Sequence, residues 1–233
     1  LDNSHGYIGS QENLEIRSVT VDNTRGGLIG SAGGIDLLAD AARNQGGRLL
    51  GAGDLGLTLT ASFDNTAGLV RAGGRLALDA ASVINTRTQG EGLGLEGREV
   101  HLRTTQLDNR DGALRADTAL SVTSGGLIDN SRGLISSLGL LALTDPATLG
   151  QTLAITHTGG TLLAGTRLSV NALRLSGDGQ LLSGGDLAVR LNSSFDNRSE
   201  IRANGDADFD TSGTLTNRAT LAVGGTLQLG ASA

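Results

Sequence analysis

The sequence lacks several residue types that compact folds of this size normally use. Its 233 residues include no Cys, Met or Trp, one Pro and four aromatic residues, one Tyr and three Phe. Irregular globular cores use aromatic and Met side chains to fill uneven space, so the composition argues against such a core. The apolar residues are mostly Leu, Ile, Val and Ala, which stack well in regular layers. The absence of Cys excludes a thiol nucleophile, and it fits both chance and a chain that is exported unfolded.

The charge pattern also excludes some functions. The formal net charge is −6, and all 18 basic residues are Arg. An acidic chain without a basic run argues against nucleic acid as a partner. The longest uncharged stretch that leans apolar, residues 133–144, is shorter than the roughly 20 residues that cross a bilayer, so we expect no membrane insertion. No signal peptide is visible at Leu1, which starts inside a repeat, and we expect the chain to be part of a longer protein.

An asparagine, often preceded by Asp, recurs along the chain. Successive markers are separated by 20, 21, 21, 20, 24, 21, 27, 20, 20 and 20 residues, with His157 and Gly177 at two of the marker positions. An apolar residue stands two positions before every marker, and Gly-rich corners separate alternating apolar pairs such as Leu76/Leu78. The nine asparagines are Asn3, Asn23, Asn44, Asn65, Asn85, Asn109, Asn130, Asn197 and Asn217.

This periodicity predicts the fold. Each unit contains short strands separated by Gly and Asn corners, and one unit cannot bury its apolar face alone. Stacking the next unit on top does bury it. We therefore predict a parallel β-helix of about eleven coils of about 20 residues, forming one segment over residues 1–233.

We expect the recurring asparagines to have a structural role. Asn tolerates the left-handed backbone that a sharp corner needs, and stacked amides can hydrogen bond to one another as a ladder. The acidic residues just before the markers are expected to face solvent; these are Asp2, Asp22, Asp64, Asp108, Asp129 and Asp196.

The units that begin at Leu1 and Phe63 resemble filamentous-haemagglutinin repeats. Such repeats occur in the exoproteins of bacterial two-partner secretion systems, both adhesins and contact-dependent growth-inhibition effectors. The resemblance covers nearly the whole chain. It implies a right-handed β-helix, export through an outer-membrane two-partner secretion transporter, and a filament secreted to the bacterial cell surface. The family's amino-terminal secretion motif, Asn-Pro-Asn-Gly, does not occur in this sequence.

Two long spacings indicate corner insertions, near residues 88–94 and 145–152. Loops carry binding more often than strands do, so a partner contact is sought first in the second insertion, at Asp145, Pro146 and Thr148. Solenoids also tolerate insertions that have no function.

Other motifs give no catalytic, cofactor or metal site. Residues 51–56 match a dinucleotide fingerprint, but a strand pattern follows them where that motif needs a helix. Asp206, Asp208 and Asp210 alternate along one strand face, where a solvated acidic face is favoured over a weak calcium site. The three histidines, His5, His101 and His157, lack the spacing of a metal site.

The sequence therefore favours a non-enzymatic structural stalk that displays a functional tip. Two alternatives stay open: a receptor- or glycan-binding segment that uses the 145–152 insertion, and a β-helical enzyme that cleaves polysaccharides. Because the end coils of this segment would expose strand edges, we also expect end-to-end association of the isolated segment.

Overall fold

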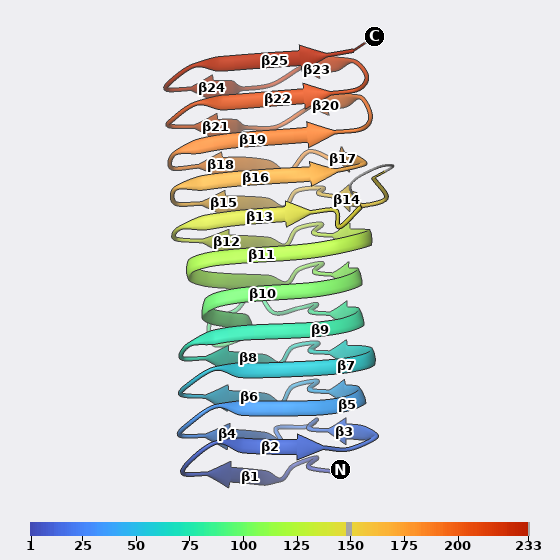
Figure 1. Cartoon of the computed structure of the whole chain (residues 1–233), viewed down its shortest axis with the longest axis vertical. Helices are drawn as coiled ribbons and strands as arrows, with labels where there is room; N and C mark the ends of the chain where they lie inside the picture. Colours follow the sequence, from blue (N-terminus) through green and yellow to red (C-terminus); the bar gives the residue numbers. More distant parts are fainter. Residues whose placement is uncertain (148–150, 233) are drawn as a thin grey trace.

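The computed structural model describes residues 1–147 and 151–232, and these residues form a three-sided rod of parallel strands (Figure 1). The prediction of a parallel β-solenoid is confirmed, with about 11 turns of ~21 residues each. At a strand spacing of about 4.8 Å per coil, the rod is roughly 50 Å long. Among the described residues, no helix is long and apolar enough to span a membrane.

The first side of each coil follows the Asn corner. Its strands are β1 (Tyr7–Ser10), β4 (Leu28–Ser31), β6 (Arg48–Gly51), β8 (Leu69–Ala72), β12 (Leu134–Ser137), β15 (Thr161–Ala164), β18 (Gln180–Ser183), β21 (Ile201–Ala203) and β24 (Leu221–Val223).

The second side is the longest and faces the viewer in Figure 1. Its strands are β2 (Leu14–Arg17), β5 (Ile35–Arg43), β7 (Leu55–Asp64), β9 (Arg75–Ile84), β13 (Leu140–Thr144), β16 (Arg167–Ala172), β19 (Asp186–Leu191), β22 (Ala207–Thr211) and β25 (Leu227–Ala231).

The third side leads into the next Asn corner. The ends of β5, β7 and β9 lie here, because these strands bend around the preceding corner, β5 and β7 with register shifts in their pairing. Two further strands, β10 (Gly94–Asp108) and β11 (Ala113–Asp129), continue around all three sides. The separate strands of this side are β3 (Thr20–Asp22), β14 (Ala154–Thr156), β17 (Arg174–Ser176), β20 (Phe195–Asn197) and β23 (Leu215–Asn217).

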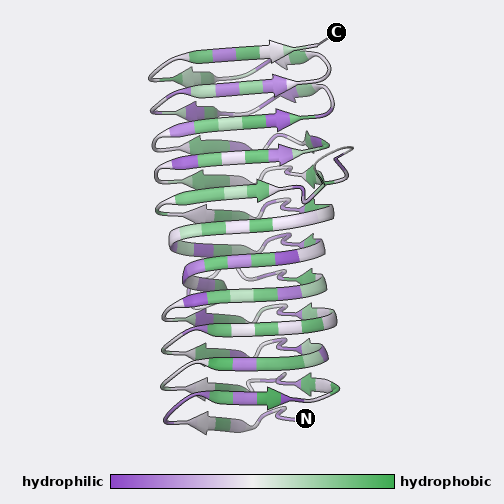
Figure 2. Cartoon of the chain, in the orientation of Figure 1, coloured by the Kyte–Doolittle hydropathy of each residue, from purple (hydrophilic) through white to green (hydrophobic). Residues whose placement is uncertain are grey.

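The core is a set of apolar columns that run along the rod axis. Strand alternation turns every second residue inward, and parallel in-register pairing places equivalent residues above one another. Figure 2 shows the resulting stripes of hydrophobic and hydrophilic residues across the second side. One column on this side is Leu37, Leu57, Leu78, Leu102, Val122, Leu143, Val170, Val189 and Phe209.

The apolar residues two positions before the markers form another inward column on the third side. Phe63, Val83 and Ile128 there are fully buried. Near the carboxyl-terminal end, Phe195 from this column stacks on Phe209 of the second side, with ring centroids 6.2 Å apart. Each buried side chain of this kind contributes about 1.5–3 kcal/mol of transfer free energy. Since such side chains recur from coil to coil, the stabilisation is distributed along the rod.

Candidate functional site: the asparagine ladder and the corner insertions

Seven of the nine marker asparagines form one continuous column of hydrogen bonds. The Nδ2 group of each amide donates to the Oδ1 atom of the next amide along the rod, at 2.7–2.9 Å, from Asn3 through to Asn130. The other two markers pair separately, with Asn197 Nδ2 donating to Asn217 Oδ1 at 2.7 Å. The sequence markers therefore meet in space in two groups.

Each ladder amide also bonds to the backbone. Asn23 Nδ2 donates to the carbonyl oxygen of Arg48 at 3.0 Å, and Asn85 Nδ2 donates to that of Ala113 at 2.9 Å. Asn65, Asn85, Asn109 and Asn130 are fully buried. A buried polar group without a partner costs about 1–3 kcal/mol, so the mutual pairing is what makes an amide column compatible with the interior.

The prediction that the asparagines adopt the left-handed backbone is wrong. Positive φ angles occur two residues after the marker, at His5, Arg25, Gly46, Ala67, Arg87, Asp111, Arg132 and Gly159. In most corners up to Asn130 the marker starts a four-residue turn, in which its carbonyl oxygen accepts from the N–H group three residues later, as Asn44 does from Gly47 at 3.0 Å. The asparagine is selected for its side chain, and the left-handed residue follows from the turn.

Glycine stands at that third position in most of the lower corners, whereas Thr88 takes it after Asn85. A Cβ atom on Gly47 or Gly68 would overlap the backbone carbonyl oxygen of the asparagine one coil below, Asn23 or Asn44. By contrast, a Cβ atom on Gly46 meets nothing within 4 Å. The close approach of the turn to the coil beneath therefore explains the Gly in the repeat.

The acidic residues before the markers are mostly half-buried, and not fully exposed to solvent as the sequence predicts. Their carboxylates accept from the backbone N–H group two residues later, as Asp22 does from Thr24 at 3.1 Å and Asp129 from Ser131 at 3.0 Å. Asp196 instead binds the guanidinium groups of Arg198 and Arg218, whose side-chain hydrogen bonds lower the pKa of its carboxyl group. These carboxylates hold the corner in shape, a role that the Asp–Asn pattern alone does not reveal.

The first insertion is fixed to the coil above it. Thr88 is fully buried; its Oγ1 atom donates to the carbonyl oxygen of Asn85 and accepts from the N–H group of Ala113, both at 3.0 Å. From the next coil, the Arg115 guanidinium donates to the carbonyl oxygens of Gln89 and Leu93, at 2.9 and 3.0 Å. The extra residues are thus anchored at both ends of the loop.

The Asp145 side chain, at the first of the positions where a partner contact is sought, is directed into its own loop. It is 4% exposed, and its carboxylate accepts from the backbone N–H groups of Ala147, Thr152 and Leu153. Desolvation opposes its ionisation, but these N–H groups outweigh it and hold the pKa below its ordinary value. Pro146 lies beside Gly125 of the coil below. Thr148 lies outside the described residues.

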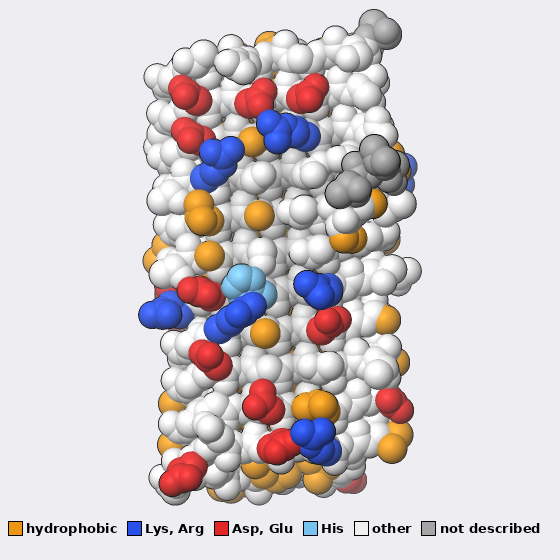
Figure 3. All heavy atoms as spheres, in the orientation of Figure 1, with side chains coloured by type: hydrophobic (Ala, Val, Ile, Leu, Met, Phe, Trp, Pro, Cys, Tyr) orange, Lys and Arg blue, Asp and Glu red, His pale blue; other side chains and the backbone are white. Residues whose placement is uncertain are grey.

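The outer face of the second side carries interspersed charges of both signs, with no large area of one sign (Figure 3). Pairs join neighbouring coils, such as Arg190 with Asp208 at 3.5 Å and Arg167 with Asp186 at 3.8 Å. One carboxylate oxygen of Asp206 accepts a hydrogen bond from the N–H group of Thr226 at 2.7 Å. Within the described residues, no group of three or more His, Asp or Glu side chains is placed to hold a metal ion.

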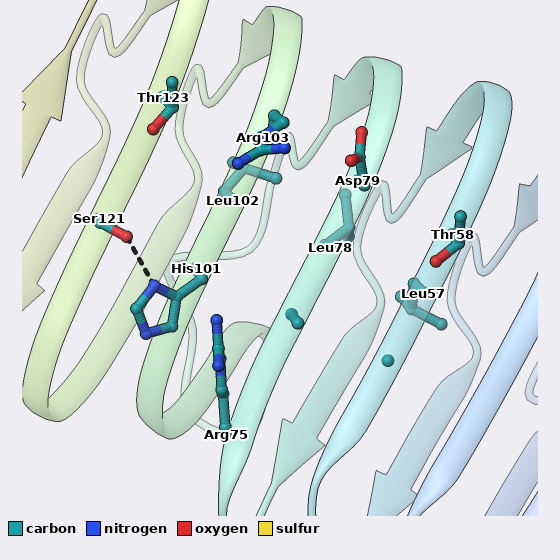
Figure 4. Close-up of a pocket in the computed structure, with 12 residues that line it drawn as sticks. Leu57, Thr58, Arg75, Leu78, Asp79, His101, Leu102, Arg103, Ser121 and Thr123 are labelled. Atoms are coloured by element: carbon teal, nitrogen blue, oxygen red, sulfur yellow. Dashed lines mark hydrogen bonds between the residues drawn. The ribbon is translucent and has the colours of Figure 1, made fainter. Parts of the chain in front are cut away.

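A shallow hollow of about 280 Å³ lies on the same face, over β7, β9, β10 and β11. Gly56 and Ala77 leave space there, and His101, whose Nδ1 atom is 2.9 Å from Ser121 Oγ, stands at its side (Figure 4). Arg75 and Arg103 line the hollow, but Asp79 also lines it and Glu99 approaches His101 at 3.6 Å. Positive and negative groups are therefore balanced, and the hollow indicates no class of ligand.

Residues 51–56 join two strands, and only residues 52–54 lie between them. Gly51 ends β6 and Leu55 begins β7, so no helix follows the glycines to face a phosphate.

Taken together, the stacked coils, the amide ladder and the tight corners define a repeat solenoid, and comparison with known proteins places it in a family. The haemagglutinin repeat model matches residues 1–62, 51–95, 95–159, 127–182 and 167–231. The chain belongs to the haemagglutinin repeat family, which confirms the resemblance seen in the sequence.

A curated relative is the protein named deoxyribonuclease CdiA of Dickeya dadantii (strain 3937). It is 31% identical over 252 aligned residues, which cover 95% of this chain and 7% of the relative. The chain thus spans a small fraction of the length of that protein. No solved structure matches the chain.

Proposed function

We propose that this chain is part of the stalk of a secreted bacterial surface filament, and that it holds a functional region of a longer exoprotein away from the cell. The observation that carries the proposal is the continuous stack of coils. Each coil pairs in parallel register with the next from β1 to β25, so coils add length in equal steps of about 4.8 Å.

The surface chemistry supports a spacer. The first insertion is held by Arg115 of the next coil, and Thr152 at the end of the second insertion donates to the carbonyl oxygen of Gly125 on the coil below. Charged side chains of the second side pair with one another across coils. Such a surface stays soluble and offers few unpaired groups to a partner. The relative of the chain is far longer, which fits a segment whose role is to span distance.

Two further elements of the proposal rest on the family. Haemagglutinin repeats in exoproteins of two-partner secretion imply an outer-membrane transporter as the export partner and the cell surface as the location. The longer protein would be an adhesin or, as the similarity to CdiA favours, a contact-dependent growth-inhibition effector.

Neither alternative function has a specific observation in its favour. A glycosidase needs a carboxylic acid with a raised pKa, whereas hydrogen bonds from arginine side chains lower the pKa of Asp108, Asp111 and Asp196. The Asp145 carboxylate gives no support to a binding role for the second insertion, because it accepts hydrogen bonds inside the loop.

Deletion of whole coils tests the stalk. In the exoprotein that carries this segment, removing residues 24–85 takes out three coils between equivalent asparagines. We expect the filament to shorten by about 14 Å in electron micrographs, with display of its distal end retained. Removing residues 24–75 cuts between non-equivalent positions and serves as the control, which should disrupt the stack.

Loss of target-cell contact by the 24–85 deletion, at normal surface display, would refute the stalk and make this segment a contact region. Attachment of the purified chain to target cells would lead to the same conclusion.

A further inference from the structure

His157 occupies a marker position and continues the asparagine ladder with a different side chain. Asn130 Nδ2 lies 3.1 Å from the Nδ1 atom of the imidazole, and Nε2 lies 3.0 Å from the carbonyl oxygen of Gln180 on the coil above. The ring is 2% exposed. Both ring nitrogens are thus used inside the rod.

The partners of the ring determine its protonation state. Asn130 Oδ1 already accepts from Asn109, so the Asn130 group that faces His157 is the donating Nδ2. Nδ1 must then be an unprotonated acceptor. A carbonyl oxygen only accepts, so Nε2 must carry the proton. The geometry is consistent only with the neutral imidazole that is protonated at Nε2.

The imidazole also spans a gap in the ladder. The next marker position is Gly177, which has no side chain, and a Cβ atom on Gly179 would overlap the His157 ring. The ring therefore fills the space that a marker amide would occupy on that coil. The side-chain column stops here and resumes at Asn197.

Charged groups around His157 give little support to a cation. On the coil below, the carboxylate of Asp129 is bonded to Ser131, and Arg132 is paired with Asp111. On the coil above, Asp178 is exposed, and its carboxylate accepts from the N–H group of Gly159.

One coil further on, Glu200 approaches the side chain of Gln180 at 3.4 Å. Of the charged groups around the ring, Asp178 is the one that favours the imidazolium, and it is in solvent.

We propose that His157 is an acid-sensitive joint in the rod: protonation of Nδ1 removes the bond from Asn130 and loosens the corner between the coils of Asn130 and Gly177. The uninterrupted amide ladder from Asn3 to Asn130 contains no titratable group and keeps its strength in acid. At low pH the rod would therefore open at one corner, the one that contains His157.

The direction of the pH effect follows from burial. Desolvation lowers the pKa of His157 below 6.5, although the bond to Gln180 and the charge of Asp178 oppose this. The folded corner then takes up its proton at lower pH than the open corner does. Its stability is complete above about pH 6.5 and falls as the pH drops from there toward the folded-state pKa.

Nitrogen NMR of the ring and amide hydrogen exchange test the proposal on the folded chain. At pH 7.5 we expect the His157 ring to be neutral and protonated at Nε2. Below about pH 6.5, the opening equilibrium of the amides of Arg132, Gly133 and His157 should rise by up to about tenfold per pH unit, after correction for intrinsic exchange. The corner amides of Asn44 and Gly47 should show no such rise.

Two variants complete the test. His157→Asn should abolish the pH-dependent rise, although its shorter side chain leaves a space between this coil and the coil of Gly177. His101→Asn removes a half-exposed imidazole outside the ladder and should keep the wild-type profile. An imidazolium or an Nδ1–H tautomer at pH 7.5 overturns the proposal, as does the same rise in His157→Asn. If His157→Asn does not fold, His157→Gln replaces it with the same expectation.

Discussion

The rod turns the Asn corner in two different ways, below and above His157. Below it, a residue with positive φ stands two positions after the marker, and in most corners Gly follows it. The ladder amide there donates to the carbonyl oxygen four residues after the next marker, as Asn23 does to Arg48 and Asn44 does to Leu69. Above it, Glu200 and Thr220 take the position of the Gly, and Asn197 donates to Thr220, three residues after the next marker.

The interactions that form a coil are different from those that form the Asn corner. Coil length stays at 20 residues from His157 to Asn217, and the first- and second-side strands keep their register through both regions. On the third side, β20 and β23 form a separate two-stranded sheet. Backbone pairing and the inward apolar columns therefore define the coil. The amide ladder and its Gly turn add contacts between coils at the corner. The upper coils keep the amide pair of Asn197 and Asn217 but lack the Gly turn.

The largest expected effect comes from Gly47→Ala. Its Cβ atom would overlap the carbonyl oxygen of Asn23, which belongs to the backbone and cannot move without separating two coils. We expect a loss of about 3 kcal/mol or more in the free energy of unfolding, measured by urea denaturation.

Two matched variants sharpen this result. Gly46→Ala adds a methyl group in open space and should cost only about 0.5 kcal/mol, because the strain at φ of +62° is partly offset by the lower entropy of the unfolded chain. Glu200→Ala, at the equivalent position of an upper corner, should change stability by less than about 0.5 kcal/mol. Equal costs for Gly47→Ala and Glu200→Ala would show that the two corners do not differ in the way described.

Asn85→Ala is expected to cost somewhat less, about 2–3 kcal/mol. It removes the side-chain acceptor of Asn65 Nδ2 and the amide that donates to Asn109 Oδ1 and to the carbonyl oxygen of Ala113. Asn217→Ala removes the exposed last member of the upper pair and should cost less than about 1 kcal/mol. Denaturation of both variants by urea measures the difference, and a larger loss for Asn217→Ala would contradict a stronger lower ladder.

Much of this arrangement could be predicted from the sequence, because it depends on spacing. A marker every 20 or 21 residues, with an apolar residue two positions earlier, is sufficient to place Asn44 above Asn23 and Phe63 in the core. Residues at the same position in successive repeats contact each other, and the spacing of the markers identifies these positions in the sequence.

Other features depend on contacts that the spacing does not show. The left-handed position holds residues as different as Arg25, Ala67 and Asp111, so no residue type marks it. Gly occurs three residues after the marker, as at Gly47, because a Cβ atom there would overlap a carbonyl oxygen of the coil below. The spacing does not show that Asp145 is buried, because three N–H groups from later in the chain, those of Ala147, Thr152 and Leu153, donate to its carboxylate.

Asp145→Ala should cost about 2 kcal/mol, because the N–H group of buried Leu153 loses its acceptor. Limited proteolysis should then cut within residues 145–153 faster than in the wild type, while the first insertion stays resistant. Since the pKa of Asp145 lies below 3.8 in the folded chain, its contribution is complete above that pH and is lost as the pH falls further. An unchanged cutting rate in Asp145→Ala would show that the carboxylate does not close the loop.

The smallest expected effect is a gain, from Ala67→Gly in a lower corner. Ala67 has φ of 52°, which costs a residue with a Cβ atom about 1–2 kcal/mol. Glycine removes this strain but adds about 0.4–1 kcal/mol of entropy to the unfolded chain, so the net gain should be roughly 0.5 kcal/mol. Ala219→Gly, two residues after the last marker in an upper corner, lacks a positive φ to relieve and should lose stability by the entropy term alone. Opposite signs for these two substitutions in urea denaturation would establish that the corners differ in backbone conformation, whereas a loss in both would show that the left-handed residue of the lower corners carries no strain.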